Sequence, residues 1–237
     1  MVSDNNTTSF AFEQQRNNIR RHFSVMVKPV GAACNLDCDY CYYLEKDTLY
    51  SGKNSNSRFL RMSDEVLEKL ICDHIHAQPG EQVEFIWHGG EPPMAGVDYF
   101  RKIISLQNKY AEGKKINNSL QTNGTLIDDE WAEFLVGNNF LCGLSIDGPN
   151  KFHDKHRRFS NGQGSWEKAI AGAQLCAKHG VELNTMKVVN ASNRKHPVAV
   201  YECLKELGTR VMQFTPIVER IALDETAPFS IRDKTDD

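Results

Sequence analysis

Three cysteines stand close together near the start of this 237-residue chain. Their spacing, Cys34-x-x-x-Cys38-x-x-Cys41, lets one short loop wrap three thiolates around a single metal centre. Structural zinc sites and ordinary ferredoxin clusters take four protein ligands. No fourth cysteine lies nearby in the sequence, so an iron–sulfur cluster held here would keep one iron open to an outside ligand. The alternative is a structural zinc site completed by a distant Cys or His.

The other four cysteines do not extend this motif. They stand singly in apolar segments, where free cysteine behaves as a small hydrophobic residue; they are Cys72, Cys142, Cys176 and Cys203. In a chain of this length without a secretory pattern, clustered thiols indicate metal binding or catalysis rather than disulfides.

Composition narrows the class of protein further. Hydrophobic residues make up 40% and charged residues 25% of the chain, values typical of a globular protein with a sizeable core. The net charge of -3 argues against nucleic acid as a partner. No apolar run reaches the roughly 20 residues of a membrane span, and the polar start does not resemble a signal peptide. We therefore expect a cytoplasmic protein without a membrane partner.

Strand-like and helix-like segments alternate along the chain, which predicts an α/β fold of parallel strands joined by right-handed crossovers. Gly180 and Gly208 are natural helix ends, and Ser63 is a natural helix start. The predicted strands are 23–30, 82–88, 115–121, 140–146, 182–189 and 210–215. The predicted helices are 63–77, 98–112, 128–138, 166–179 and 197–207.

Polar residues near the carboxyl ends of these strands favour a partial (β/α)6 TIM-like barrel over an open doubly wound sheet. A strand covered on both faces would be almost continuously apolar. Here polar residues recur at period two and so share one face, with Leu144 and Ile146 on the other. Single strand-end residues could simply be hydrated, but the series indicates a barrel interior that holds a polar ligand. The series is Gln121, Asn123, Ser145, Asp147, Asn184, Gln213 and Thr215.

The same pattern divides the chain into three parts. Residues 1–22 form a polar lead-in, residues 23–216 form the barrel, and residues 217–237 are expected to begin a truncated C-terminal region. The polar character of this last segment, after an uncovered sixth strand, is the reason for expecting a truncation.

Further residues at the predicted barrel mouth have polar groups suited to ligand binding. Gly89 and Gly90 allow the backbone to approach a ligand closely. Tyr43 and His88 would face the mouth near a substrate, or could be ordinary packing and strand-end residues. Arg158 and its neighbour Arg157 could neutralise a carboxylate, or could belong to a solvated basic loop.

Taken together, these motifs resemble the radical S-adenosylmethionine (SAM) superfamily, and most of all its anaerobic sulfatase-maturating enzymes. The resemblance covers about residues 22–225. It is carried by the cysteine motif, Gly89-Gly90-Glu91-Pro92, Gln121-Thr122-Asn123-Gly124, Leu144-Ser145-Ile146-Asp147-Gly148-Pro149 and the segment 212–220.

The resemblance implies two cofactors, a [4Fe–4S] cluster on Cys34, Cys38 and Cys41, and SAM on its open iron. Tyr40 would cover the adenine ring, Glu91 would meet the SAM amino group, and Arg158 the carboxylate. The remaining residues expected to contact SAM are Gly89, Gly90, Pro92, Gln121, Asn123, Ser145, Asp147 and Asn184.

The implied reaction oxidises a Cys or Ser of a sulfatase to formylglycine through a 5′-deoxyadenosyl radical. A flavodoxin- or ferredoxin-type protein would supply electrons. In this family two auxiliary clusters and a proposed general base lie in a C-terminal extension, so the base is expected beyond Asp237 and its identity is unknown. Two alternatives remain: a maturase of another peptide or protein, and a non-catalytic metal-binding fragment.

Overall fold

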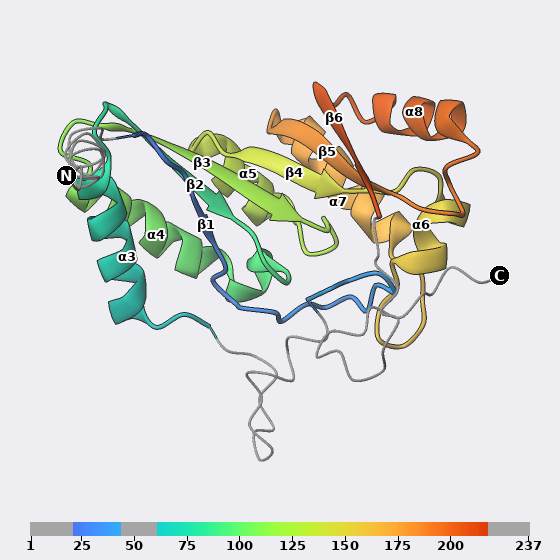
Figure 1. Ribbon diagram of the computed structural model, residues 1–237, viewed down its shortest axis with the longest axis horizontal. Coiled ribbons are helices and arrows are strands. Elements are labelled where there is room, and N and C mark those ends of the chain that lie inside the picture. Colours follow the sequence, from blue (N-terminus) through green and yellow to red (C-terminus); the bar gives the residue numbers. More distant parts are fainter. Residues whose placement is uncertain (1–20, 44–60, 218–237) are drawn as a thin grey trace, which may run out of the picture.

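The computed structural model describes residues 21–43 and 61–217, in which six parallel strands form one sheet (Figure 1). Each strand pairs with the next along the chain, in the order β1-β2-β3-β4-β5-β6. The strands are β1 Val25–Val27, β2 Gln82–Trp87, β3 Lys115–Thr122, β4 Leu141–Ser145, β5 Glu182–Val189 and β6 Val211–Pro216. Sequential parallel pairing requires a crossover between every two strands.

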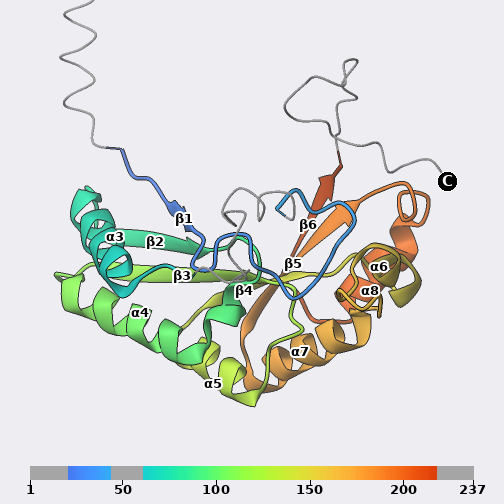
Figure 2. The same ribbon diagram turned by 90° about the horizontal axis from the view of Figure 1, so that it is seen from below.

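Helices supply these crossovers. They are α3 Asp64–Ala77, the short 3-10 helix η1 Pro92–Ala95, α4 Val97–Tyr110, α5 Asp129–Gly137, α6 Asn150–His156, α7 Trp166–His179 and α8 Pro197–Lys205. Figure 2 shows the sheet curving, with α4, α5 and α7 along its outer side. The strand–helix alternation thus forms a partial TIM-like barrel, which confirms the predicted fold class.

Local signals in the sequence set several helix ends. The Ser63 hydroxyl accepts a hydrogen bond from Val66 N, and the Asp128 carboxylate accepts one from Trp131 N, so both residues cap helix N-termini. Gly180 ends α7 in the left-handed region, at φ 78°, where glycine has no Cβ clash.

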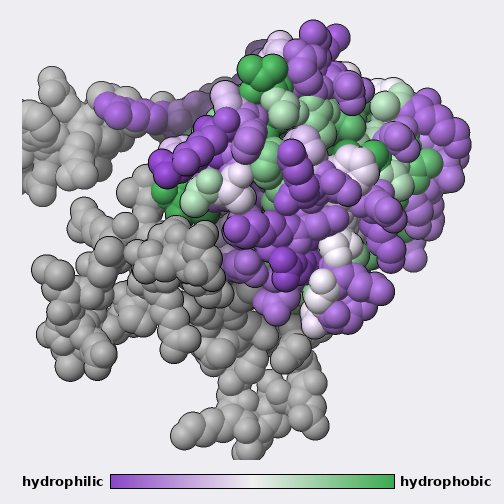
Figure 3. All heavy atoms as spheres, turned by 90° about the vertical axis from the view of Figure 1, so that its right-hand side faces the viewer, coloured by the Kyte–Doolittle hydropathy of each residue, from purple (hydrophilic) through white to green (hydrophobic). Residues whose placement is uncertain are grey.

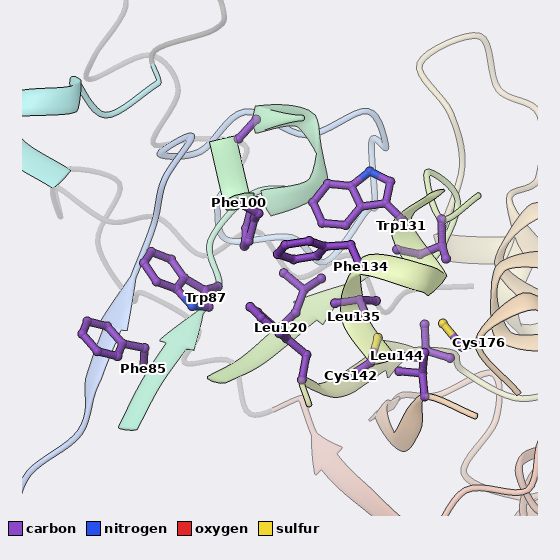
Figure 4. Close-up of a cluster of buried hydrophobic side chains, with 14 of the residues drawn as sticks. Phe85, Trp87, Phe100, Leu120, Trp131, Phe134, Leu135, Cys142, Leu144 and Cys176 are labelled. Carbon is purple, nitrogen blue, oxygen red and sulfur yellow. The ribbon is translucent and has the colours of Figure 1, made fainter. Parts of the chain in front are cut away.

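An aromatic cluster joins the outer face of the sheet to the helices (Figure 4). Phe100 of α4 lies at its centre, fully buried, with ring centroids 5.8 Å from Trp87 and 5.2 Å from Trp131. Cys142 and Cys176 are buried in the same core, as expected for two of the scattered cysteines. The core fixes the helices against the sheet and leaves the opposite, inner face for a ligand.

Strand β4 shows how the two faces of the sheet differ. Cys142 and Leu144 are fully buried in the outer core, while Leu141 and Gly143 line the barrel interior. Ile146, just after the strand, also packs in the outer core. This alternation is the one that the period-two pattern predicts.

The sequence-based element bounds need some corrections. The first strand is only Val25–Val27, because Pro29 has no N–H and the chain turns through Gly31 at φ 60°. The second predicted helix ends at Tyr110 rather than 112, because Glu112 has a positive φ of 48°. The last helix ends two residues earlier than predicted. The short helix α6 was not predicted at all.

Residues 1–20, 44–60 and 218–237 lie outside the described part of the chain. Most of the predicted lead-in and nearly all of the predicted C-terminal region therefore remain predictions. Among the described residues no helix is long and apolar enough to cross a membrane. The face seen in Figure 3 is mostly hydrophilic, with hydrophobic residues in small separate groups.

Candidate functional site

The cysteine loop, residues 28–43, crosses the carboxyl end of the sheet after β1 (Figure 2). It runs against the end of β2, where Gly90 N donates to Gly31 O (3.0 Å) and Glu91 N donates to Ala33 O (2.7 Å). A Cβ atom on Gly90 would lie 1.9 Å from Ala33 O. Only glycine therefore permits this approach of the two backbones.

The other side of the cysteine loop is held by residues 156–159, at the end of α6 and directly after it. Asp37 N donates to Arg158 O (2.7 Å), and Asp39 N donates to His156 O (3.1 Å). The residues around Cys38 belong to no helix or strand, so these bonds satisfy backbone groups that regular secondary structure would otherwise pair.

A ring of side-chain hydrogen bonds fixes the first cysteine. Asn123 Nδ2 donates to Asn35 Oδ1 (2.9 Å), Asn35 Nδ2 donates to Thr125 Oγ1 (2.8 Å), and Thr125 Oγ1 donates to Asn123 Oδ1 (2.7 Å). Asn123 Nδ2 also lies 3.9 Å from Cys34 Sγ. The Asn123 amide, predicted to bind a ligand oxygen, is thus engaged in holding the loop.

Glu91 is buried and its carboxylate points to the end of β3. It accepts hydrogen bonds from Thr122 Oγ1 and from Asn123 N (2.9 Å). Burial raises the pKa of Glu91 to about 7, and the two donors oppose that shift. The carboxylate predicted to meet the SAM amino group already has protein partners in this structure.

Asp147 follows β4 and is fully buried. Its carboxylate accepts hydrogen bonds from Tyr40 Oη and from Arg157 Nε (3.1 Å). Burial raises the pKa of Asp147, but the charge of Arg157 and the hydrogen bond from Tyr40 lower it, and the lowering effects outweigh burial. The net shift of the pKa is therefore downward, and the carboxylate is ionised. Arg157, rather than the exposed Arg158, is the arginine whose side chain reaches the cysteine loop, with its guanidinium 5.5 Å from the centre of the Tyr40 ring. Arg158 Nε instead donates to Asp154 O (2.7 Å).

Burial is the main influence on the thiols of Cys34 and Cys38. Burial raises the pKa of Cys34 and of Cys38 to about 12, and each of the two is raised further by the charge of Cys41. Glu91 adds to the shift at Cys34, whereas the charge of Arg157 lowers the pKa of Cys38. Such thiols ionise when bound iron provides positive charge.

This donor set fits an iron–sulfur cluster. The thiolates of an iron–sulfur cluster each bind a different iron. Three cysteines from one loop, with Gly90 admitting the β2 backbone beside them, suit a cluster that keeps one iron open.

A cavity of about 350 Å³ lies on the inner face of the sheet. Gln121, Asn184 and Gln213 line it, as the period-two pattern predicts. Gln121 Nε2 donates to Ser145 Oγ (2.9 Å), and a Cβ on Gly143 would lie 2.3 Å from Gln121 Oε1, so Gly143 leaves room for this side chain. The wall also includes apolar residues: Met26, Ile86, Leu141, Met186 and Val211.

Tyr43 and His88 lie together, with ring centroids 6.3 Å apart. His88 also lines the cavity, and its Nδ1 accepts a hydrogen bond from Gly89 N (2.6 Å). The Lys28 ammonium lies 4.4 Å from the centre of the Tyr43 ring. Burial and the Lys28 charge lower the pKa of His88, so this imidazole is neutral near pH 7.

The structure thus gathers most of the predicted site residues at one end of the barrel. The side chain of Arg158 is the exception, although the carbonyl oxygen of this residue contacts the cysteine loop. Those around the cysteine loop are Tyr40, Tyr43, Gly89, Gly90, Glu91, Pro92, Asn123 and Asp147; those in or beside the cavity are His88, Gln121, Ser145 and Asn184. Sequence reasoning missed Asn35 and Thr125, although each stands within two residues of a predicted site residue.

Comparison with known proteins gives a family. The model of the Radical SAM superfamily matches residues 29–204. The serine-type anaerobic sulfatase-maturating enzyme of Bacteroides thetaiotaomicron is 52% identical over 197 residues, covering 83% of this chain and 47% of that enzyme. The cysteine-type enzyme of Clostridium perfringens is 40% identical over 192 residues, covering 81% and 50%. The chain spans about half the length of these curated relatives.

Solved structures agree with this result. Native anSMEcpe with bound AdoMet and the Cp18Cys peptide aligns with a TM-score of 0.76 and 36% identity, covering 89% of this chain and 55% of that one. SuiB of Streptococcus suis bound to S-adenosylmethionine, at 16% identity and a TM-score of 0.62, shares the fold. The superfamily's cofactors are a [4Fe–4S] cluster and SAM, which suit the three-cysteine loop described above. Because the matched region includes all three cysteines and most of the chain, this protein belongs to the radical SAM superfamily.

Proposed function

We propose that this chain is the radical SAM portion of an anaerobic sulfatase-maturating enzyme, which oxidises a Cys or Ser of a sulfatase to formylglycine. The observation that carries the proposal is a three-cysteine loop fixed over the open end of a barrel whose interior contains a cavity. Similarity to both serine-type and cysteine-type sulfatase-maturating enzymes gives the substrate class but leaves the target residue open.

In this proposal Cys34, Cys38 and Cys41 hold the cluster. Bound there and reduced, the cluster would supply the electron for reductive cleavage of SAM, and with it the radical chemistry that oxidises the substrate. The chain's own residues position these groups and exclude water.

The proposed SAM contacts fall into two groups. Gln121 and Asn184 present side-chain amides to the cavity, and Gly89 and Gly90 present backbone at its mouth. A second group has its polar atoms engaged within the protein and would act by shaping the site; its members are Tyr40, Glu91, Asn123, Ser145 and Asp147. Pro92 begins η1 and fixes the chain direction there.

The substrate end of the site would include Tyr43 and His88. A sulfatase polypeptide would reach it through the open barrel mouth, and a flavodoxin- or ferredoxin-type protein would reduce the cluster. Reduced thiols in a cysteine-rich loop suit the cytoplasm. We place the general base and the auxiliary clusters outside the residues described here.

Anaerobic reconstitution tests this function. The protein is expected to take up about four irons with matching sulfide, and to release 5′-deoxyadenosine from SAM when dithionite is present. Cys34→Ala, Cys38→Ala or Cys41→Ala should each abolish both results, whereas the control Cys203→Ala, at a partly buried position on α8, should not.

A sulfatase-derived peptide identifies the substrate class. Aldehyde formation in a protein of the relatives' full length, trapped with a hydrazine and located by mass spectrometry, would support sulfatase maturation. SAM cleavage without aldehyde would favour a maturase of another peptide. About one zinc per chain without sulfide would overturn the enzymatic proposal.

A further inference from the structure

The side of the molecule formed by α6, the start of α7 and the segment after β5 carries exposed positive charge that the proposed reaction does not use. The acidic residues of these segments, 150–168 and 191–196, are Asp154 and Glu167, so the local charge is positive although the whole chain carries -3. The basic residues are all exposed, and none of them forms an ion pair within residues 21–43 and 61–217. We call this set the α6 basic surface; its members are Lys151, Lys155, Arg158, Lys168, Arg194 and Lys195.

On α3 and α4, by contrast, exposed cations have acidic partners. Lys69 pairs with Asp73 (2.8 Å), and Lys109 pairs with Glu68 (2.7 Å). A pair largely cancels its own field at a distance, whereas unpaired cations on one surface add up to a field that attracts an acidic partner. The α6 basic surface therefore differs from the rest of the helical layer in the charge that it presents to solvent.

The two segments of this surface lie against each other. The ring of His196 stacks on that of Phe152 in α6, with centroids 5.0 Å apart, and His156 Nε2 lies 3.1 Å from Ser192 Oγ. His156 Nδ1 lies 3.2 Å from Asp39 Oδ2, so the same residue also contacts the cysteine loop. The α6 basic surface is thus one continuous area that reaches the loop.

The border with the cysteine loop is formed by backbone and ring contacts. Arg158 O accepts a hydrogen bond from Asp37 N (2.7 Å), and Phe159 pairs with Leu36. The Lys168 ammonium lies 5.2 Å from the centre of the Phe159 ring. Figures 1 and 2 show the loop and α6 side by side at the carboxyl end of the sheet. A protein bound at the α6 basic surface would therefore lie next to the proposed cluster.

We propose that the α6 basic surface is the docking site of an acidic electron-donor protein that carries a low-potential flavin or iron–sulfur centre. The donor loses one electron and the cluster on the cysteine loop gains it, which requires the two carriers to lie close together. Electron-transfer partners bury little surface area, so charge steers their encounter. The inference rests on the proposed function of the cluster but not on the sulfatase substrate.

The experiment compares a protein donor with a small reductant. The reconstituted chain receives either reduced flavodoxin at increasing concentration or dithionite, and the initial rate of 5′-deoxyadenosine formation from SAM is measured. Lys155→Glu/Lys195→Glu reverses two charges of the α6 basic surface. Lys115→Glu/Lys205→Glu is the matched control, because these two lysines are also exposed but stand at the start of β3 and at the end of α8, away from the cysteine loop.

With flavodoxin, Lys155→Glu/Lys195→Glu should need about tenfold more donor for half-maximal rate, because steering by charge changes association rates by about 10- to 1,000-fold. Added salt should weaken the wild type more than this variant. With dithionite, wild type and both variants should react equally. Equal half-saturating concentrations of flavodoxin for the two variants would overturn the proposal. No product from wild type with dithionite would instead contradict the proposed function.

If Lys155→Glu/Lys195→Glu fails to fold or to take up iron, cross-linking of the wild type decides. A carbodiimide joins lysine amines directly to the carboxylates of bound flavodoxin, and mass spectrometry locates the linked lysines. Links are expected at Lys151, Lys155, Lys168 or Lys195. Links only at other lysines, or no links, would refute the proposal. Tighter binding of RNA or DNA than of flavodoxin would also refute it.

Discussion

Gly90 lies just after β2, where the chain runs against the cysteine loop. Two backbone hydrogen bonds join the two segments there. No side chain fits between them, since a Cβ would overlap Ala33 O and lie close to Ala32 as well. The site therefore depends on the lack of a side chain at Gly90 as well as on the thiols.

Gly90→Ala should therefore displace the cysteine loop. Forcing an added methyl group into a packed contact costs about 1–3 kcal/mol of unfolding free energy, and we expect iron uptake to fall with it. Gly80→Ala is the control, because a Cβ there meets nothing within 4 Å. Chemical denaturation and iron analysis measure both effects; equal behaviour of the two variants would contradict this account.

His153 gives a second prediction at the residue scale, concerning pH. Its Nδ1 accepts from Asp147 N (3.3 Å), so Nε2–H must donate to Ser165 Oγ (3.0 Å), which in turn donates to Arg157 O (2.9 Å). Burial, with a further contribution from Arg157, lowers the pKa of His153 to about 3. The folded protein thus holds a neutral imidazole.

Between about pH 6.5 and pH 3 the unfolded chain binds a proton at His153 that the folded chain does not, so acid destabilises the fold. Glu91, with its raised pKa, has the opposite effect between about pH 4.5 and 7. Comparing wild type with His153→Gln cancels the Glu91 contribution. From pH 6.5 to pH 5, wild type should lose about 2 kcal/mol more than the variant. Parallel stability curves from urea denaturation would show that His153 does not titrate this way.

Neighbouring strands and helices hold the irregular cysteine loop in place. The cysteine loop is anchored by β2 on one side and by the segment after α6 on the other, where Leu36 also pairs with Phe159. Both anchors depend on helices that pack against the outer face of the sheet. The position of the thiols thus depends on core packing some distance from them.

Phe100→Ala tests this dependence. The ring of Phe100 contacts Trp87, Trp131, Phe134 and Phe140 with no solvent exposure, and truncating such a residue costs about 3–5 kcal/mol. We expect a lower melting temperature in thermal unfolding followed by circular dichroism. Val198→Ala, at a position 71% exposed on α8, should unfold like wild type.

At the scale of the whole molecule, two features lie at one end of the barrel: the loop that we propose binds the cluster, and the cavity on the inner face of the sheet. The loop has little regular structure of its own, so we expect the bound cluster to contribute to the stability of this end. Metal that binds only the folded arrangement stabilises it by mass action.

Cluster removal tests this coupling. Reconstituted protein should melt at a higher temperature than the apo protein, and limited proteolysis should cut apo protein faster within residues 28–43. The variant lacking all three clustered cysteines should show no difference after the same treatment. Identical melting of apo and reconstituted wild type would mean that the loop is fully formed without metal.

Much of this protein could be predicted from the sequence alone. The order of strands and helices follows from apolar periodicity and from caps such as Ser63 and Gly180, since both are local properties of the chain. The cysteine spacing likewise defines the chemistry, because three thiols within eight residues can converge on one centre in almost any loop conformation.

The tertiary structure alone decided which polar atoms remain available. Arg157 rather than Arg158 reaches the site, and the polar groups of Asn123, Glu91 and Asp147 are used inside the protein. In an irregular loop no periodicity tells which of two neighbouring side chains points inward. That choice depends on contacts between segments more than 80 residues apart, such as Asn35 with Asn123 and Tyr40 with Asp147.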